Sequence, residues 1–233
     1  MSTPEVNPTT DLLRGKRILV TGVLTPKSIA FAIAEACQKA GAEIVLTSFG
    51  RAMSLTEKSA QRLSPAPEIL EMDVTDIAQV HAVAEHVRST WGRVDGVVHA
   101  IGFAPADCLG GGFLEAPWSS VSTAFHVSSY SLQTLAAAFA PLMPERGGSI
   151  VTLTFDARVA WPVYDWMGPA KAALEAIARY LARKLGPRRI RENTTSAAPP
   201  GTIPPAPIRG FDAQHHGREA PQPRRSARTA RGP

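Results

Sequence analysis

A tyrosine and a lysine seven residues apart, Tyr164 and Lys171, are the pair of side chains in this sequence best suited to chemistry. If their segment is helical, a step of seven residues is nearly two turns, so the phenol and the ammonium project from one face. Such a face can hold a substrate oxygen and a cofactor ribose together. Because this spacing also arises by chance in many helices, the interpretation depends on the elements around the pair.

The composition indicates a globular protein without a membrane partner. The chain has 233 residues, of which 44% are hydrophobic and 19% charged, enough to bury the core of one domain. No apolar run reaches the roughly 18 residues that a membrane span needs, and the first residues lack the pattern of a signal peptide. We therefore expect a cytoplasmic location. Cys37 and Cys108 are the only cysteines, so we expect free thiols and no metal site.

The net charge of +5 is concentrated near the end of the chain. Residues from Arg209 onward carry a net +4, and eight of the 20 prolines lie between 199 and 233. We therefore expect a disordered segment at 1–11, a folded domain at 12–195 and an irregular Pro/Arg-rich extension at 196–233. The nearly neutral remainder does not favour a nucleic-acid partner. Binding of nucleic acid or of an acidic partner by the basic extension stays open as an alternative.

Strands and helices are expected to alternate before that extension. Short apolar runs predict strands and longer periodic runs predict helices, while the residues around Pro65 and Pro67 indicate a loop. The expected strands are 16–21, 42–47, 68–73, 95–100 and 149–155, and the expected helices are 28–40, 75–91, 117–142 and 164–185. Strands with almost no polar alternation predict a parallel sheet covered on both faces, a doubly wound, Rossmann-like α/β fold.

Ligands of such sheets bind beyond the carboxyl ends of the strands. At the first strand end only one glycine, Gly22, is present instead of G-x-G-x-x-G, but it permits a tight turn, and the amides of the helix starting at Ser28 can face a pyrophosphate. Taken alone, an ordinary strand-to-helix loop explains this segment equally well. No acid follows the second strand, where NAD sites often place one. Arg51 could pair with a 2′-phosphate, although a solvated arginine is the simpler interpretation.

Three stretches resemble one family of enzymes. GKRILVTGVLTPKSIAFAIA, HAIGF and TFDARVAWPVYDWMGPAKAALE are similar to the NADH-dependent enoyl-[acyl-carrier-protein] reductases of fatty-acid synthesis, a branch of the short-chain dehydrogenase/reductase superfamily. The single early glycine followed by Ser-Ile-Ala, and Tyr-x6-Lys in place of Tyr-x3-Lys, distinguish this branch. The resemblance extends strongly over 12–185 and patchily over 186–211. It implies a homo-oligomer that acts on enoyl-acyl-carrier-protein or enoyl-CoA with NADH.

The resemblance also implies which residues bind the cofactor. In order along the dinucleotide, they are Phe49, Asp73 and Val74 at the adenine, Gly22, Ser28 and Ile29 at the pyrophosphate, Ile101, Gly102 and Lys171 at the ribose and nicotinamide, and Pro200 and Thr202 at the nicotinamide amide and phosphate. We favour NADH over NADPH because the resemblance is to the NADH class.

The chemistry implied by the resemblance is hydride transfer to the β-carbon of a trans-2-enoyl thioester. Tyr164 would donate a hydrogen bond to the thioester carbonyl, and Phe155 would lie beside the nicotinamide and the reacting double bond. Negative charge moves onto the carbonyl oxygen, and a positioned donor at such an oxygen is worth about 3–4 kcal/mol. Either Tyr164 or water can protonate the α-carbon. A related reductase acting on a carbonyl, and an inactive cofactor-binding protein, are the alternatives.

The sequence departs from the family pattern after Leu185. The segment 190–195 places Glu192 and two threonines where a buried parallel strand wants aliphatic residues, so we expect a weak or distorted strand there. Neither the family's substrate lid nor its last strand is recognisable after Phe211. A shift of reading frame from about Glu192 is one hypothesis for this change, and it would leave a truncated reductase.

Overall fold

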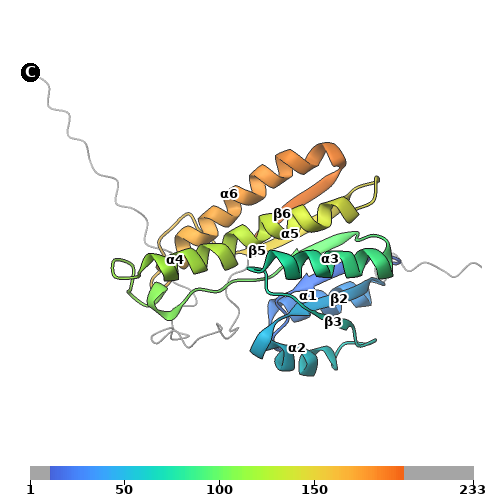
Figure 1. The fold of residues 1–233 in the computed structure, drawn as a ribbon, viewed down its shortest axis with the longest axis horizontal. Helices are drawn as coiled ribbons and strands as arrows, with labels where there is room; N and C mark the ends of the chain where they lie inside the picture. The colour runs from blue at the N-terminus through green and yellow to red at the C-terminus, as the bar shows by residue number, and fades with distance from the viewer. Residues whose placement is uncertain (1–10, 197–233) are drawn as a thin grey trace, which may run out of the picture.

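The computed structural model describes residues 11–196, and a six-stranded parallel sheet runs through them (Figure 1). Its strands are β1 (Arg17–Thr21), β2 (Glu43–Ser48), β3 (Glu68–Glu71), β4 (Gly96–His99), β5 (Gly148–Thr154) and β6 (Ile190–Ser196). The strand order is β3-β2-β1-β4-β5-β6. The chain thus moves outward from β1 to β3 and then crosses to the other side at β4. This confirms the doubly wound, Rossmann-like fold; the expected lack of a last strand and lid concerns residues outside the described range.

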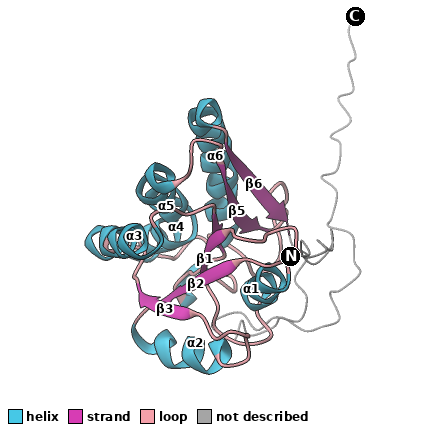
Figure 2. Ribbon diagram, turned by 90° about the vertical axis from the view of Figure 1, so that its right-hand side faces the viewer, coloured by secondary structure: helices cyan, strands magenta, loops and turns pink. Residues whose placement is uncertain are grey.

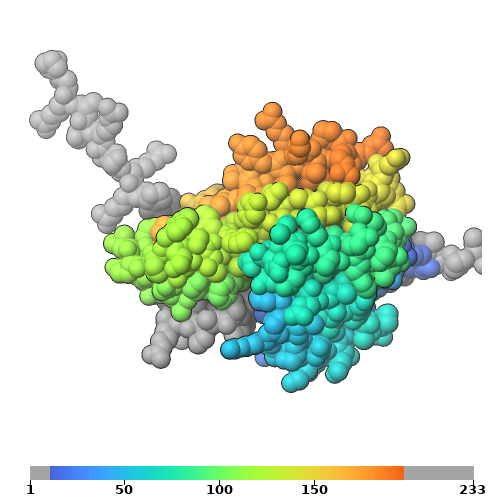
Figure 3. All heavy atoms as spheres, in the orientation of Figure 1, coloured from blue at the N-terminus to red at the C-terminus, as the bar shows by residue number. Residues whose placement is uncertain are grey.

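Helices cover both faces of this sheet. They are α1 (Ile29–Lys39), α2 (Met53–Ala60), α3 (Ile77–Trp91), α4 (Trp118–Phe125), α5 (Ser131–Phe139) and α6 (Met167–Leu185). Figure 2 shows α1 on one face of the sheet and α3, α5 and α6 on the other. Each face has its own apolar core, and the larger one lies under α3, α5 and α6. On that side the side chains of the helices close over the sheet (Figure 3).

Local signals fix where the helices begin and end. The Ser28 hydroxyl accepts a hydrogen bond from the Phe31 N–H at 3.1 Å and so caps α1. The Asp76 carboxylate caps α3 in the same way, and Gly92 ends that helix in the left-handed conformation at φ 70°. Because these capping residues can be recognised in the sequence, the predicted bounds of α1 (28–40) and α3 (75–91) differ from the observed bounds by at most two residues.

Helix α2 lies before the predicted loop around Pro65 and Pro67, in a segment for which no helix was predicted. Its buried face consists largely of hydroxyls, because Thr56 donates to the Val23 carbonyl at 2.6 Å and Ser59 donates to the Leu24 carbonyl at 3.0 Å. Helical periodicity is recognised from apolar side chains. A helix that packs through threonine and serine therefore escapes this kind of reasoning.

The helix expected over 117–142 contains an irregular turn. The π-helical turn His126–Tyr130 separates α4 from α5, and a short 3-10 turn, Ala140–Leu142, follows α5. Phe125 and Tyr130 keep right-handed helical angles, so the helical backbone continues through the junction. The expected range is thus confirmed as helical, with a widened turn in its middle.

Strand β6 pairs regularly with β5, so the expectation of a distorted strand is wrong. The register runs without interruption from Gly148↔Ile190 to Thr154↔Ser196. At the edge of the sheet most side chains of β6 are exposed, and only Ile190 is fully buried. Backbone pairing therefore suffices without an aliphatic pattern. The Glu192 carboxylate is nevertheless buried, with no hydrogen-bond partner among the described residues, and burial raises its pKa to about 8.

Replacing Glu192 with valine is expected to stabilise the fold. The folded pKa of about 8 lies above the usual 4.5, so the free energy of unfolding falls as the pH rises from 4.5 through 8. We expect Glu192→Val to raise the free energy of unfolding by about 3 kcal/mol at pH 8 and by little at pH 4.5. The gain at pH 8 is smaller than the full pKa shift implies, because part of the residue contacts water. Urea unfolding at both pH values measures this. Asn193→Ala, at an exposed neighbour, is the control, and a destabilised Glu192→Val at pH 8 would contradict the prediction.

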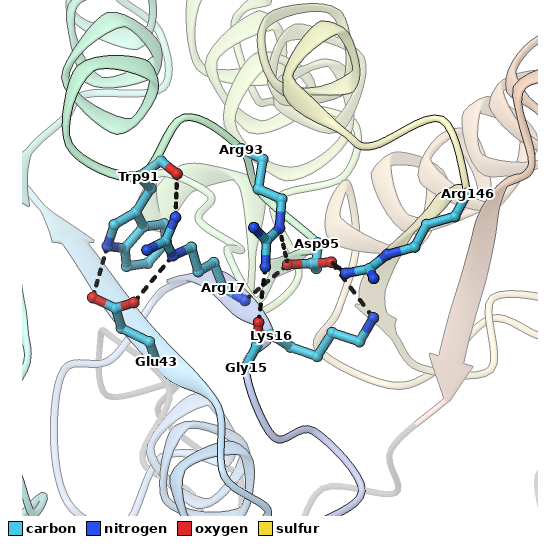
Figure 4. Close-up of polar contacts among 8 residues, drawn as sticks. All are labelled: Gly15, Lys16, Arg17, Glu43, Trp91, Arg93, Asp95 and Arg146. Atoms are coloured by element: carbon cyan, nitrogen blue, oxygen red, sulfur yellow. Dashed lines mark hydrogen bonds and ion pairs between the residues drawn. The ribbon is translucent and has the colours of Figure 1, made fainter.

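A cluster of charges ties together the amino ends of the central strands (Figure 4). The Asp95 carboxylate accepts a hydrogen bond from the Arg17 N–H at 3.2 Å and contacts Arg93 at 3.2 Å, Arg146 at 2.9 Å and Lys16 at 3.5 Å. Burial alone would raise the Asp95 pKa, but the bonds from Arg146 and Arg17 and the charges of Lys16 and Arg93 outweigh it and lower the pKa. This cluster lies at the end of the sheet opposite to the strand carboxyl ends.

We expect Asp95→Asn to lower the free energy of unfolding by about 2 kcal/mol, because it weakens several charge-assisted hydrogen bonds. Since the folded pKa of Asp95 is depressed, this contribution is present above the usual value of 3.8 and is lost as the pH falls through the lower folded pKa. Urea unfolding at pH 7 and pH 3 tests both statements. Glu35→Gln, which removes the exposed ion pair with Lys39, is the control. Equal small losses in the two variants would refute the assignment.

Candidate active site

The residues predicted to bind a dinucleotide gather at the carboxyl edge of the sheet. Gly22 follows β1, Phe49 follows β2 and Phe155 follows β5, while Ile101 lies two residues after β4. Parallel strands place these positions along one edge. The strand order reverses direction between β1 and β4, in the middle of this edge. Doubly wound sheets bind their ligands at such a point.

The turn after β1 is tight and leads into the first turn of α1. Gly22 has φ 81°, and a Cβ at this position would lie 2.0 Å from the Ala100 carbonyl oxygen, so only glycine fits. Ser28 caps the Phe31 N–H, whereas the N–H groups of Ile29 and Ala30 in the first turn have no intrahelical acceptor. A helix start of this kind fits an anionic phosphate.

The predicted adenine residues differ in their accessibility. Phe49 is 48% exposed, so its ring is free to lie against a base. Val74 is buried in the larger core, which leaves its main chain as the part that a ligand can reach. The Asp73 carboxylate accepts hydrogen bonds from the N–H and hydroxyl of Thr75 at 2.8 and 2.7 Å. These residues thus lie at the same edge of the sheet, but they differ in which of their groups a ligand can contact.

Sequence reasoning missed a carboxylate beside the end of β2. Glu71, the last residue of β3, pairs in register with Ser48, and its Oε1 accepts a hydrogen bond from the Gly50 N–H at 3.4 Å. Glu71 does not follow β2 in the sequence, where a ribose-binding acid is usually expected. The predicted parallel sheet could have indicated this position, because the last residue of β3 lies beside the last residue of β2 in such a sheet.

Lys171 connects the ends of two central strands. Its Nζ donates to the Leu153 carbonyl at 3.0 Å and to the Ile101 carbonyl at 3.4 Å, and the residue is only 7% exposed. Burial lowers its pKa to about 8. A Cβ at Gly102 would lie 3.5 Å from this Nζ, so the loop after β4 passes directly over the amine. The predicted neighbours Ile101, Gly102 and Lys171 are therefore brought together.

Tyr164 does not lie in the helix that carries Lys171, which corrects the expectation of one helix over 164–185. Helix α6 begins at Met167, and Val163 and Asp165 have φ angles of 63° and 39°. The reason is Pro169, which has no N–H to donate to the carbonyl four residues earlier and whose ring clashes with that carbonyl in a helix. A helix containing Pro169 in its first turn cannot extend back to Tyr164.

Contact with Phe155 instead places Tyr164 at the carboxyl edge. The two ring centroids are 4.4 Å apart with an interplanar angle of 52°. Phe155 follows β5 directly, two residues after the carbonyl that Lys171 binds. Burial raises the pKa of Tyr164, so its hydroxyl stays protonated at neutral pH. The loop before α6 thus carries the phenol to the end of β5, whereas α6 itself carries the amine there.

His99 lies beneath this site as a neutral, fully buried ring. Its Nδ1 lies 2.8 Å from the Thr152 hydroxyl oxygen and its Nε2 lies 2.8 Å from the Ser131 hydroxyl oxygen. Burial, and then the charge of Lys171, lower the His99 pKa to about 3. Within residues 11–196 no three His, Cys, Asp or Glu side chains are grouped to hold a metal ion. No helix in that range is long and apolar enough to cross a membrane.

Two of the predicted nicotinamide residues, Pro200 and Thr202, lie outside the described residues.

Trp166, which directly precedes α6, stacks on Phe113 with ring centroids 4.7 Å apart and donates from Nε1 to the Phe113 carbonyl. These contacts make Trp166 part of a small apolar cluster. Trp166 therefore packs within this cluster, two residues after Tyr164.

Comparisons with known proteins give a consistent result. The sequence model of the family described as "Enoyl-(Acyl carrier protein) reductase" matches residues 22–231, beyond Phe211, where we expected the resemblance to end. The chain is 43% identical over 205 residues to "Enoyl-[acyl-carrier-protein] reductase [NADH]" of Mycolicibacterium smegmatis, covering 86% of this chain and 76% of that protein. It is 42% identical to the Mycobacterium avium enzyme of the same name, over 85% and 75% of the two chains. It is 40% identical to "Enoyl-[acyl-carrier-protein] reductase [NADH] FabI" of Synechocystis, over 88% and 81%.

Proposed function

Because this chain belongs to the enoyl-(acyl carrier protein) reductase family, we propose that it reduces the double bond of a trans-2-enoyl thioester with NADH. The substrate would be carried by acyl carrier protein or coenzyme A. The observation that carries the proposal is that Tyr164, against the Phe155 ring, and Lys171, bound to the Leu153 carbonyl, both lie at the carboxyl end of β5. The relatives named above are NADH enzymes, which supports NADH as the cofactor.

The residues at this edge are chemically suited to hold a dinucleotide. Gly22 and the first-turn amides of α1 would hold the pyrophosphate, Phe49 would lie against the adenine, and Lys171 would donate to the nicotinamide ribose. When bound, the cofactor supplies the hydride, while the protein supplies orientation and electrostatics. The carboxylate of Glu71 beside Gly50 adds negative charge where a 2′-phosphate would lie, which favours NADH over NADPH.

Tyr164 would stabilise the negative charge that develops on the thioester carbonyl oxygen. Its protonated hydroxyl is a neutral donor, and its ring is held against Phe155. Contact with Phe155 limits the positions of the phenol, so little reorganisation is needed when the charge appears. The α-carbon then takes a proton either from Tyr164 or from water.

Lys171 would act as a charged donor that is already partly desolvated. Its bonds to the Leu153 and Ile101 carbonyls fix the amine between β4 and β5 before any ligand arrives. With a pKa of about 8, the amine is charged at neutral pH and loses its charge as the pH rises above that value. Cofactor affinity should therefore decline in alkaline solution.

A cofactor-consumption assay tests the proposed function. NADH absorbance at 340 nm is followed with crotonyl-CoA and with a longer enoyl thioester, and each reaction is repeated with NADPH. We expect steady oxidation of NADH that requires the enoyl thioester, and a slower reaction with NADPH. Reaction with a β-ketoacyl thioester but not with the enoyl thioesters would instead favour the alternative, a related reductase acting on a carbonyl.

A further inference from the structure

The π-helical turn between α4 and α5 directs serine hydroxyls at several elements of the candidate site. We call Ser128, Ser129 and Ser131 the serine turn; the first two lie in the turn His126–Tyr130, and Ser131 begins α5. All three residues are buried. Widened turns of this kind are rare in helices and occur frequently at functional sites.

Ser128 holds the loop that follows β4. Its hydroxyl donates to the Phe103 carbonyl at 2.7 Å and accepts from the Phe103 N–H at 2.9 Å. Phe103 directly follows Ile101 and Gly102, which lie against the Lys171 amine. A side chain that binds both main-chain groups of one residue fixes the loop at that point.

Ser129 holds the helix that carries the lysine. Its hydroxyl donates to the Ala170 carbonyl at 2.5 Å, and both residues are buried. Ala170 immediately precedes Lys171. The bond therefore anchors the first turn of α6, whose start is otherwise determined by Pro169 rather than by a side-chain cap.

Ser131 binds the end of β4 through His99. The Ser131 hydroxyl donates its one proton to the Val127 carbonyl at 2.7 Å, so its oxygen accepts from the His99 Nε2–H at 2.8 Å. The His99 Nδ1 then accepts the one proton of the Thr152 hydroxyl at 2.8 Å, in preference to the His99 carbonyl, which lies farther from that hydroxyl at 3.3 Å. This assignment gives the neutral ring that burial requires. It links α5, β4 and β5 through buried hydrogen bonds.

We propose that the serine turn is a positioning device, which sets the Lys171 amine relative to the strand ends that it bridges. The three serines act through Phe103, Ala170 and His99, so they are positioning residues. The proposal rests on the proposed function for its catalytic consequence. The placement itself is a property of the chain without ligands and is measured separately.

Ser129→Ala tests the proposal most directly, because it removes the bond to the helix of Lys171. We expect the NADH dissociation constant to rise and kcat to fall, each about tenfold, as small displacements of catalytic groups have effects of this size or larger. Ser122→Ala is the matched control, since that hydroxyl donates to the Ser119 carbonyl at 3.0 Å on the exposed side of α4. Ser129→Thr, which keeps a hydroxyl, should recover part of the loss.

A second readout follows the lysine itself in the ligand-free protein. The lysine side chains are labelled at Cε and titrated by NMR, and the Lys171 signal is identified by its absence in Lys171→Met. The midpoint should lie near 8 in the parent and in Ser122→Ala, and should move toward the usual 10.5 in Ser129→Ala as water reaches the amine. If Ser129→Ala does not fold, Ser128→Ala is measured in the same way.

The two readouts separate the possible failures. If the parent does not oxidise NADH with any enoyl thioester, the proposed function fails, and the titration alone decides whether the serine turn positions Lys171. If Ser129→Ala and Ser122→Ala give the same dissociation constant, kcat and titration midpoint, the positioning proposal is overturned even if their melting temperatures differ.

Discussion

Replacing Tyr164 with phenylalanine is expected to lower kcat about 100- to 1,000-fold while NADH affinity stays within about twofold. The substitution removes the hydroxyl that would face the carbonyl oxygen but keeps the ring on Phe155, 4.4 Å away. The loss should therefore fall on the chemical step. Steady-state kinetics with an enoyl thioester and a fluorescence titration with NADH measure the two quantities.

A second tyrosine provides the control for that experiment. Tyr180 is 74% exposed on α6, away from the strand ends, and Tyr180→Phe should leave kcat within about twofold. If Tyr164→Phe retains more than a third of the parent's kcat, the phenol does not stabilise the developing charge. Water or another donor would then have to perform that role.

The substitution Lys171→Met should have opposite effects on binding and on stability. Loss of a charged donor to the ribose is expected to weaken NADH binding about 10- to 100-fold, since hydrogen bonds to charged groups contribute about 1.5–3 kcal/mol. At the same time methionine fills the buried space without a charge to desolvate. We therefore expect the free energy of unfolding at pH 7 to rise.

The pH dependence of stability provides a further check on Lys171. Its folded pKa of about 8 lies below the usual 10.5, so the unfolded chain binds more protons between these values and the stability of the parent rises with pH across that window. Lys171→Met should lack this rise. Lys184→Met, at an exposed position near the end of α6, should retain it and should leave NADH affinity unchanged. A parent whose stability is flat across this window would show that the amine is not desolvated.

The sheet could be predicted from the sequence because its strands are continuous apolar runs. Leu19 and Val97 are buried on one face of the sheet and Val20 and Val98 on the other, so successive strand residues are apolar and leave little ambiguity about their structure. The edge strand β6 lacks this signal, and its polar residues led to the wrong expectation of distortion. An exposed edge strand is held by backbone pairing with its neighbour, which a linear pattern does not show.

The parts of the site that escaped prediction depend on contacts between distant segments. Glu71 reaches the end of β2 from a neighbouring strand, and the hydroxyls of the serine turn bond to residues up to 41 positions away. Tyr164 and Lys171 both lie near the end of β5, but not on one helix as the sequence spacing predicted. The helical spacing argument fails at Pro169, and ring contact with Phe155 replaces it.

Transfer of deuterium from NADH labelled at both C4 positions tests the central claim most directly. The parent chain is incubated with this cofactor and a trans-2-enoyl thioester, and the product is analysed by mass spectrometry and NMR. Our account predicts a saturated thioester with one deuterium on the β-carbon. An unchanged double bond, or deuterium on a carbon that bears a new hydroxyl, would contradict it.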